Sequence, residues 1–221
     1  MFVHCPPTKL PDLVSVTQPD GKRFYTTPSG KKLPSVTTVM GAMQKQSILE
    51  WRAKVGAEEA NKVSKLATSR GNRVHNLAEK YLKNETIRWP MEMPDAVEMF
   101  RGIRPLIDNH IDNVHYLEQT LWSEKVGMAG RVDLIAEYDG VLSVIDFKTS
   151  KREKQKEDID HYFAQCTAYA LMYEELVGNP IDQIVVMMAV EHEQPLIFVE
   201  KTTDYIEKLV EHIDFYRKSL A

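Results

Sequence analysis

The sequence predicts a mixed fold, α/β or α+β, in which helices flank a central sheet of parallel and antiparallel strands. Helical segments come first and are followed by a hairpin, a helix, two strands and a last helix, an order typical of a sandwich with a mixed central sheet. The 221 residues are 43% hydrophobic and 27% charged, as is usual for a globular protein. We expect one domain over residues 1–221, divided into an N-terminal hairpin and helical region at 1–115 and a region of sheet and helices at 116–221.

The N-terminal region is predicted to begin with a small hairpin and to continue as helices. Residues 22–33 form the hairpin, because Pro28-Ser29-Gly30 is a turn sequence, and helical sequence follows Pro34-Ser35. The tetrapeptide Ser47-Ile-Leu-Glu is a capping box, which predicts a helix from Ser47 to about Ala67. We expect this helix to break at Ser69-Arg70-Gly71.

Two further helices are predicted before the sheet. One covers residues 72–82, where the apolar side chains share a stripe formed by Val74, Leu77, Ala78 and Tyr81. The other covers residues 94–113, where Pro94 begins the helix and Pro105 is expected to kink it.

The stretch from Gly130 to Lys151 predicts a β-hairpin with acids in its middle. Residues 131–138 and 141–148 alternate and are rich in β-branched and aromatic side chains, which favours two strands. Asp139-Gly140 between them is typical of a two-residue turn. Counting back from that turn places Asp133 directly opposite Asp146.

This pairing of acids is costly unless a cation occupies it, because like charges directly opposite one another destabilise a sheet. Lys148 lies two residues beyond Asp146 and therefore projects from the same face. Two carboxylates and a lysine in one cluster favour a divalent metal ion with oxygen ligands. The alternative is a surface ion-pair cluster, since a lone Asp-x-Lys also arises by chance.

The C-terminal part is predicted to complete the sheet and its helices. The charged stretch at 148–158 is expected to be a solvated loop, and a helix spans about Ile159 to Val177, ending at Gly178-Asn179-Pro180. Two strands follow at 184–190 and 196–201, and Thr203 is expected to cap a last amphipathic helix.

Composition argues against several classes of protein. The only two cysteines, Cys5 and Cys166, argue against a disulfide framework, a cysteine zinc site and a four-cysteine iron–sulfur cluster. No apolar run approaches the ~18 residues of a membrane span, and the N-terminus lacks secretory-signal features, so we expect a cytoplasmic protein without a membrane partner. No P-loop sequence is present, so ATP is not expected. The net charge of −4 argues mildly against a protein that coats nucleic acid, but not against an enzyme that grips phosphates locally.

Three residues outside the hairpin have ordinary explanations when each is taken alone. Gln165 and Tyr169 are four residues apart and share a helix face, where a glutamine is more often simply solvated. His75 lies beside an apolar stripe, where a histidine is more often a satisfied core residue than a metal ligand.

Taken together and in this order, the motifs resemble the PD-(D/E)xK nuclease superfamily, RecB-like branch. The segments that carry the resemblance are Gly71-x-x-x-His75, Gly130-Arg-x-Asp133, Ile145-Asp-Phe-Lys-Thr149 and Gln165-x-x-x-Tyr169. Within that branch the chain resembles mitochondrial genome maintenance exonucleases and related phage exonucleases, from Leu33 through the last helix. Val132 stands where the family's motif has its proline.

The resemblance implies a restriction-endonuclease-like core with an N-terminal helical arch, and it implies roles for the motif residues. One or two Mg²⁺ or Mn²⁺ ions would be bound by His75, Asp133, Asp146 and the backbone carbonyl of Phe147. Lys148 would orient the attacking water and stabilise the transition state, and Gln165 would position water or substrate.

DNA contacts are expected near this site. The candidates for gripping the DNA backbone are Arg70, Arg73, Thr149, Ser150, Lys151 and Arg152. Tyr169 is also a candidate substrate contact, although it is expected mostly to pack. Tyr81, Trp51 and Trp89 either stack on bases in the arch or pack in the core, and packing is favoured.

The resulting hypothesis is a metal-dependent DNA exonuclease that degrades single strands from their ends, in replication, recombination or repair. The expected partners are DNA and phage or host replication or recombination proteins. Alternatives within the class are a duplex-end exonuclease and a structure-specific endonuclease. An inactive DNA-binding scaffold with a nuclease fold is the alternative of another class; a purely structural domain would require several coincidences.

Overall fold

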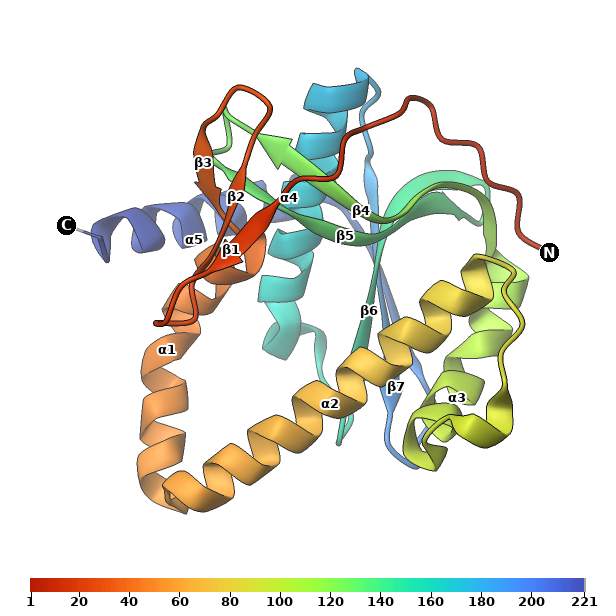
Figure 1. The fold of residues 1–221 in the computed structure, drawn as a ribbon, viewed down its shortest axis with the longest axis horizontal. Coiled ribbons are helices and arrows are strands. Elements are labelled where there is room, and N and C mark those ends of the chain that lie inside the picture. The colour runs from red at the N-terminus through yellow and green to blue at the C-terminus, as the bar shows by residue number, and fades with distance from the viewer. Residues whose placement is uncertain (221) are drawn as a thin grey trace.

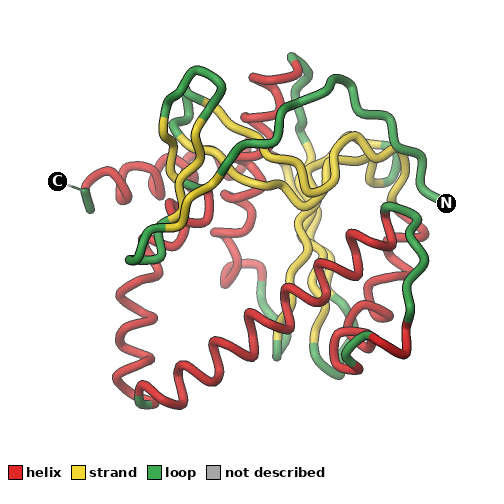
Figure 2. The backbone as a smooth tube through the Cα atoms, viewed as in Figure 1, coloured by secondary structure: helices red, strands yellow, loops and turns green. Residues whose placement is uncertain are grey.

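A five-stranded mixed sheet forms the centre of the computed structural model, which describes residues 1–220. Two neighbouring strands, β6 (Val141–Ser150) and β7 (Gln183–Val190), are parallel, and the other neighbouring pairs are antiparallel. This confirms the predicted mixed sheet. Figure 1 and Figure 2 show helices packed around this sheet. In order across the sheet the strands are β4 (Ile111–Ser123), β5 (Met128–Tyr138), β6 (Val141–Ser150), β7 (Gln183–Val190) and β8 (Leu196–Lys201).

The helices divide between the two faces of the sheet. Alternate residues of β7 belong to different hydrophobic clusters, with Val186 in one and Val185 in the other, because successive strand residues point to opposite faces. One cluster contains residues of α1 (Val36–Val55), α4 (Asp160–Val177) and α5 (Ile206–Lys218). The other contains residues of α2 (Ala57–Leu82) and α3 (Pro94–His110).

A small three-stranded sheet lies at the N-terminus. It consists of β1 (Ser15–Thr17), β2 (Arg23–Thr26) and β3 (Lys32–Pro34), all antiparallel. The β2–β3 pair confirms the predicted hairpin, and β1 adds a strand that the sequence does not predict. Tyr25 and Leu33 bury this sheet against Ala129 of β5.

The predicted helix from Ser47 to Ala67, with a break at Ser69-Arg70-Gly71, is wrong. Helix α1 already begins after its N-cap Ser35, whose side chain accepts a hydrogen bond from the backbone N–H of Thr38. The chain breaks instead at Gly56, where φ is +87°, and α2 then runs through Gly71 without interruption. An isolated glycine inside a helix costs only about 1 kcal/mol, so neighbouring turns tolerate it.

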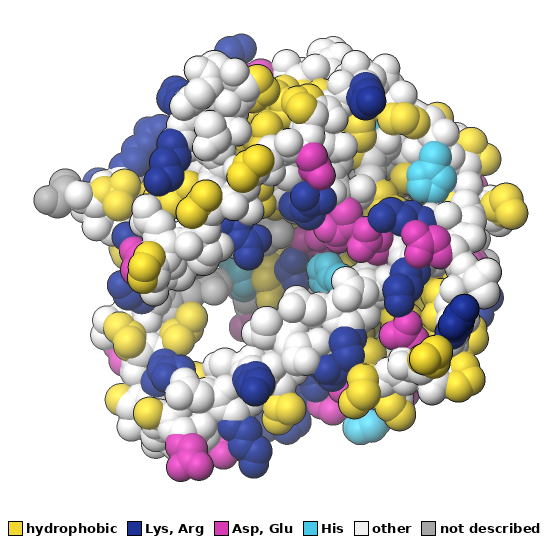
Figure 3. Space-filling model, viewed as in Figure 1, with side chains coloured by type: hydrophobic (Ala, Val, Ile, Leu, Met, Phe, Trp, Pro, Cys, Tyr) yellow, Lys and Arg dark blue, Asp and Glu magenta, His cyan; other side chains and the backbone are white. Residues whose placement is uncertain are grey.

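Helices α1 and α2 form the N-terminal arch. Figure 1 shows α1 leading away from the sheet and α2 leading back to it. In Figure 3 the surface between the arch and the sheet is hollowed, and histidine, acidic and basic side chains gather there. The predicted helical arch is therefore present.

The boundary after α3 also differs from the sequence prediction. The helix ends at His110 with Pro105 inside it, and the unpredicted strand β4 begins at the next residue. A bulge between Asp112 and Tyr116, with Asn113 at φ +43°, interrupts the alternation that would mark a strand.

The C-terminal predictions are mostly confirmed. Helix α4 ends at Gly178 in the left-handed conformation, as expected, and β7 and β8 occupy the predicted stretches. The predicted cap at Thr203 is wrong, because this residue lies inside a 3₁₀ turn and α5 begins at Ile206. The 3₁₀ turns are η1 (Trp89–Met91), η2 (Lys156–Ile159) and η3 (Thr202–Tyr205). Within residues 1–220 there is no helix with the length and apolar character needed to cross a membrane.

Candidate active site

The central sheet forks where its two aspartates stand. Asp139 and Gly140 both have positive φ, and the β5–β6 register runs from Tyr138–Val141 to Leu134–Ile145, as the sequence predicts. Beyond that step β5 continues beside β4 alone and β6 continues beside β7. The sequence predicts Asp133 directly opposite Asp146, but the pairing stops one step earlier. The two aspartates therefore lie at the branch point, on strands that diverge (Figure 1).

Asp133 bridges this fork and faces two further metal-ligand side chains. Its Oδ2 accepts a hydrogen bond from the backbone N–H of Phe147 at 2.9 Å, and it lies 3.3 Å from Nδ1 of His75 on α2. Glu118 of β4 is the third member of the group. One ligand atom from each of His75, Glu118 and Asp133 lies within 4.8 Å of the others.

Glu118 is a residue that sequence reasoning missed. It stands opposite Asp133, because the β4–β5 register pairs Leu117 with Leu134 and Gln119 with Val132. Burial and the nearby charge of Asp133 raise the pKa of Glu118 to about 7. Its φ of +50° is uncommon for a residue with a side chain. A correct prediction of β4 and its register would have found Glu118, but the bulge hides that strand.

Asp146 forms the second half of the site. Its side chain is buried; Oδ1 accepts a hydrogen bond from Nε2 of Gln165 at 2.9 Å, and Oδ2 is ion-paired with Nζ of Lys148. Within residues 1–220 the Lys148 ammonium is the partner of Oδ2. Burial raises the pKa of Asp146 to about 6, although Lys148 opposes the shift. Burial alone would lower the pKa of Lys148, but the charges of Asp146 and Asp133 outweigh it and raise that pKa.

Three ring-bearing residues of α4, His161, Tyr162 and Tyr169, lie near the Lys148 ammonium or near Gln165. Nζ of Lys148 lies 4.8 Å from the centre of the Tyr162 ring, a cation–π distance. Burial and the Lys148 charge lower the pKa of His161 to about 4. Tyr169 is buried one helical turn beyond Gln165 and packs against Gly130, which agrees with its expected packing role.

The structure separates the predicted DNA-contacting residues into two groups. Thr149 and Tyr169 line the site, but Arg70 pairs with Glu191 at 3.1 Å and Arg73 with Asp95 at 2.7 Å. These two arginines fasten α2 to the end of β7 and the start of α3, and they do not line the cavity. The remaining candidates, Ser150, Lys151 and Arg152, do not line the cavity either. The Ser150 hydroxyl instead donates a hydrogen bond to the backbone carbonyl of Arg152 at 2.6 Å.

The three aromatic residues of the helical region do not line the cavity either. Tyr81 and Trp89 pack against the α2–α3 cluster, where the Trp89 ring stacks on Phe100. Packing is therefore their role in this structure. Trp51 is half-buried on α1.

The site opens into a cavity of about 570 Å³ between α2, the sheet and the start of α4. His75, Glu118, Asp133, Lys148 and Gln165 all line it. The other lining residues are Arg23, Thr37, Thr68, Gly71, Asn72, Asn76, Glu79, Arg131, Thr149, Tyr162 and Tyr169. This arrangement combines carboxylates and an imidazole that suit a divalent metal ion with a lysine that suits a phosphate.

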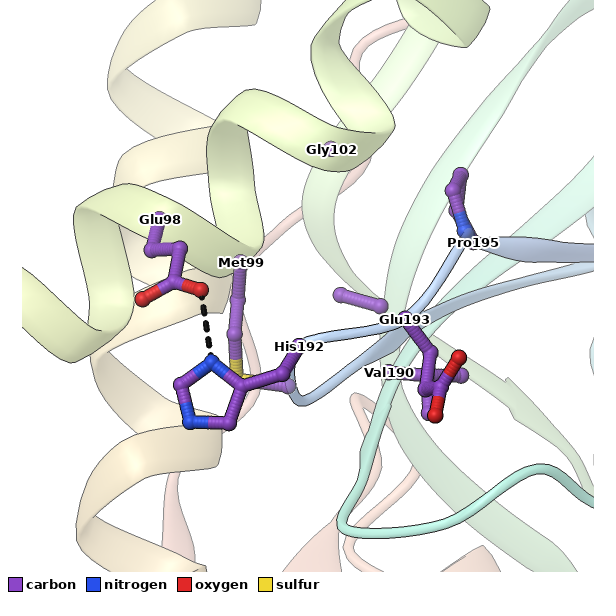
Figure 4. A pocket seen from close by; sticks show the side chains of 8 residues that line it. Glu98, Met99, Gly102, Val190, His192, Glu193 and Pro195 are labelled. Atoms are coloured by element: carbon purple, nitrogen blue, oxygen red, sulfur yellow. Dashed lines mark hydrogen bonds and ion pairs between the residues drawn. The ribbon is translucent and has the colours of Figure 1, made fainter.

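A second, smaller cavity of about 240 Å³ lies between α3 and the β7–β8 turn (Figure 4). Nδ1 of His192 lies 2.8 Å from Oε1 of Glu98, and in Figure 4 the Glu193 carboxylate points away from this pair. Within residues 1–220, the group of potential metal ligands close enough to share an ion is the one at the fork. We therefore assign the candidate active site to the fork.

The fold and the sequence place the chain among the nucleases. A sequence model of the PD-(D/E)XK nuclease superfamily matches residues 48–215, and the chain belongs to that superfamily.

Comparison with individual proteins gives one curated relative and weaker structural matches. The human protein named mitochondrial genome maintenance exonuclease 1 is 28% identical over 170 residues, which are 73% of this chain and 44% of the human protein. A candidate exonuclease from Eubacterium rectale superposes with a TM-score of 0.42 at 13% identity, over 65% of this chain and 63% of that one. The protein SSO0001 gives a TM-score of 0.39 at 14% identity, over 81% and 74% of the two chains.

Proposed function

We propose that this protein is a metal-dependent DNA exonuclease that hydrolyses phosphodiester bonds from the ends of single strands. The observation that carries the proposal is the convergence at one fork of a metal-ligand group and a buried Asp146–Lys148 pair. Both lie beneath a helical arch whose opening adjoins the cavity (Figure 3). The human relative, which is named an exonuclease, supports the choice of activity.

The residues at the fork fit a hard or borderline divalent cation. Three ligand atoms of His75, Glu118 and Asp133 converge, and the buried carboxylate of Asp146 on the diverging strand is paired with Lys148. Oxygen ligands suit Mg²⁺ and Mn²⁺, and an imidazole favours tolerance of Mn²⁺. We propose that these four side chains, with the carbonyl of Phe147, hold one or two such ions. When bound, the metal supplies a more acidic water and neutralises charge on the scissile phosphate.

The residues of the chain prepare the site for this chemistry. The Phe147 N–H fixes the Asp133 carboxylate across the fork, and Gln165 fixes that of Asp146. Lys148 stays protonated because two acids surround it, and its ammonium, held in place by Asp146, stabilises the charge that develops on the phosphoryl oxygens. A preorganised charge in a partly water-excluded site is worth more than the same charge in water.

Preference for single-stranded ends is the finer part of the proposal. The arch encloses the space beside the cavity, and a single strand, which is thinner and more flexible than a duplex, passes through such an opening more easily. The setting we propose is replication, recombination or repair in the cytoplasm, without ATP. The chain spans 44% of the length of the human relative, so partners of that protein are not transferred to this chain.

A cleavage assay tests the proposal. Single-stranded and duplex DNA, labelled separately at the 5′ and 3′ ends, are incubated with Mg²⁺, Mn²⁺ or EDTA. We expect stepwise shortening of single strands that requires metal and is lost in Lys148→Ala and Asp146→Asn. Matched controls at exposed positions are Lys125→Ala and Asp214→Asn, which should retain activity.

Each alternative predicts a different pattern. Internal fragments would indicate an endonuclease, and shortening confined to duplex ends would indicate a duplex-end exonuclease. DNA that is bound but stays intact under every condition would show that the protein is a DNA-binding scaffold and not a nuclease.

A further inference from the structure

The small N-terminal sheet contributes a cation to the active-site cavity. Arg23 of β2 lines that cavity although it lies outside the residues matched by the superfamily, 48–215. Its backbone is held by the start of α1. The Arg23 N–H donates to Oγ1 of Thr38 at 3.0 Å, and the Arg23 carbonyl accepts from the N–H of Ser35 at 2.7 Å.

The guanidinium of Arg23 has no partner of its own within residues 1–220. The two other cations that line the cavity are already engaged, because Lys148 pairs with Asp146, and Arg131 donates to the Glu118 carbonyl and lies 3.3 Å from Asp12. No hydrogen bond or ion pair joins the Arg23 side chain to the described part of the chain, whereas its backbone is fixed. The backbone of Arg23 is thus held in place, and the N–H groups of its guanidinium are free to bind a ligand.

A solvated surface arginine is the ordinary explanation for such a side chain. Two features argue for a ligand instead. Arg23 shares its cavity with the metal-ligand group, and the two arginines of α2 near that cavity, Arg70 and Arg73, are neutralised by acids. The α2 residues Thr68, Asn72 and Asn76 that line the cavity carry no charge. The cation in this cavity that is free to bind a DNA phosphate is therefore Arg23, on the N-terminal sheet.

Resting on the proposed nuclease function, we propose that Arg23 binds a phosphate of the DNA strand next to the one that is cleaved. The planar guanidinium can donate two parallel hydrogen bonds to a phosphate, which fixes position as well as adding affinity. Thr37, at the start of α1, lines the same cavity, but its hydroxyl is already hydrogen-bonded to that of Ser35 at 3.0 Å, so Arg23 is the free donor there. Arg23 would thereby place the strand relative to Lys148 without taking part in bond cleavage.

The first test measures binding without cleavage. A labelled single-stranded oligonucleotide is titrated in EDTA with the wild type, Arg23→Gln and Arg88→Gln, and the salt concentration is varied. Arg88 is an exposed arginine that does not line the cavity, so its substitution changes the net charge equally. We expect Arg23→Gln to weaken binding roughly fivefold to tenfold and to lower the salt slope by about 0.7, the value for one phosphate contact on a single strand. The control should bind like the wild type.

The second test locates the phosphate. In a series of oligonucleotides, one phosphate at a time is replaced by a neutral methylphosphonate. We expect one position at which the replacement weakens the wild type but not Arg23→Gln. An equal loss at every position would indicate long-range attraction and overturn the assignment, as would equal binding by Arg23→Gln and Arg88→Gln.

Failure of the nuclease proposal would look different. A wild type that binds DNA with this single-phosphate signature but never cleaves it would overturn the enzyme and retain the Arg23 site. A wild type that binds no single strand would overturn both.

Discussion

Asp133 and Phe147 are joined across the fork of the sheet, where Oδ2 of Asp133 accepts the backbone N–H of Phe147 at 2.9 Å. The backbone pairing between β5 and β6 has ended by this step, so a side chain satisfies a backbone donor. The same oxygen lies 3.3 Å from Nδ1 of His75. One carboxylate therefore holds the two diverging strands together and belongs to the metal-ligand group.

The two roles of Asp133 can be separated by substitution. Asp133→Asn keeps an oxygen for the Phe147 N–H but removes the charge, whereas Asp133→Ala removes both. In EDTA we expect Asp133→Asn to unfold in urea at about the wild-type concentration and Asp133→Ala to lose about 1–3 kcal/mol, the cost of an unsatisfied buried donor. Both should lose affinity for Mn²⁺ in calorimetric titrations. Equal stability of the two variants would show that the hydrogen bond does not hold the fork.

Glu118 should make the metal-free protein less stable as the pH rises. The pKa of Glu118 is raised to about 7, so between about pH 4.5 and 7 the folded protein binds more protons than the unfolded chain. The free energy of unfolding then falls with increasing pH, and the raised pKa of Asp146 acts in the same direction. Glu118→Gln should therefore stabilise the protein by about 1–2 kcal/mol at about pH 8 and hardly at all at about pH 4.

Thermal unfolding in EDTA across this pH range measures the effect. Mn²⁺ should stabilise the wild type more than Glu118→Gln, because the variant lacks one ligand charge. Parallel pH curves for the two proteins would contradict the raised pKa.

Local turn chemistry explains why much of this site could be predicted from the sequence. Asp139-Gly140 fixes the hairpin register, and that register brings Asp133 and Asp146 to the first step beyond its last pair, Leu134–Ile145. Helical spacing likewise places Gln165 and Tyr169 on one face of α4, where both line the cavity.

Features that depend on distant contacts or on particular backbone angles could not be predicted in the same way. Gly56 and Gly71 look alike in the sequence, but only Gly56 takes a positive φ. The bulge in β4 conceals the strand and with it Glu118. Arg70 is ion-paired with Glu191, 121 residues away in the sequence, and no local sequence pattern predicts such a pair.

Asp146 and Lys148 should behave as a coupled pair in unfolding experiments. Lys148→Met leaves a buried carboxylate without its cation, and we expect a loss of about 3–5 kcal/mol in EDTA. The double variant Asp146→Asn, Lys148→Met leaves no charge, and the asparagine can still accept from Gln165. It should therefore be more stable than Lys148→Met alone, with a coupling energy above about 1 kcal/mol. The single variant Asp146→Asn completes the cycle, and additive losses would show that water screens the pair. Cleavage should be lost in both single variants and in the double variant.

Gly130 should tolerate no side chain, because Tyr169 occupies the space beside it. A Cβ at Gly130 would lie 2.7 Å from the Tyr169 hydroxyl and 3.1 Å from Cγ2 of Val36. Gly130→Ala should lose about 1–3 kcal/mol by overpacking, and Tyr169→Phe should restore part of that loss by removing the hydroxyl. Gly102→Ala is the matched control, since nothing lies within 4 Å of its Cβ position in α3, and it should gain up to about 1 kcal/mol in helix propensity. The measurement is urea unfolding of the wild type, Gly130→Ala, the double variant Gly130→Ala, Tyr169→Phe and the control Gly102→Ala. If Gly130→Ala is as stable as the wild type, Tyr169 does not hold α4 rigidly against β5.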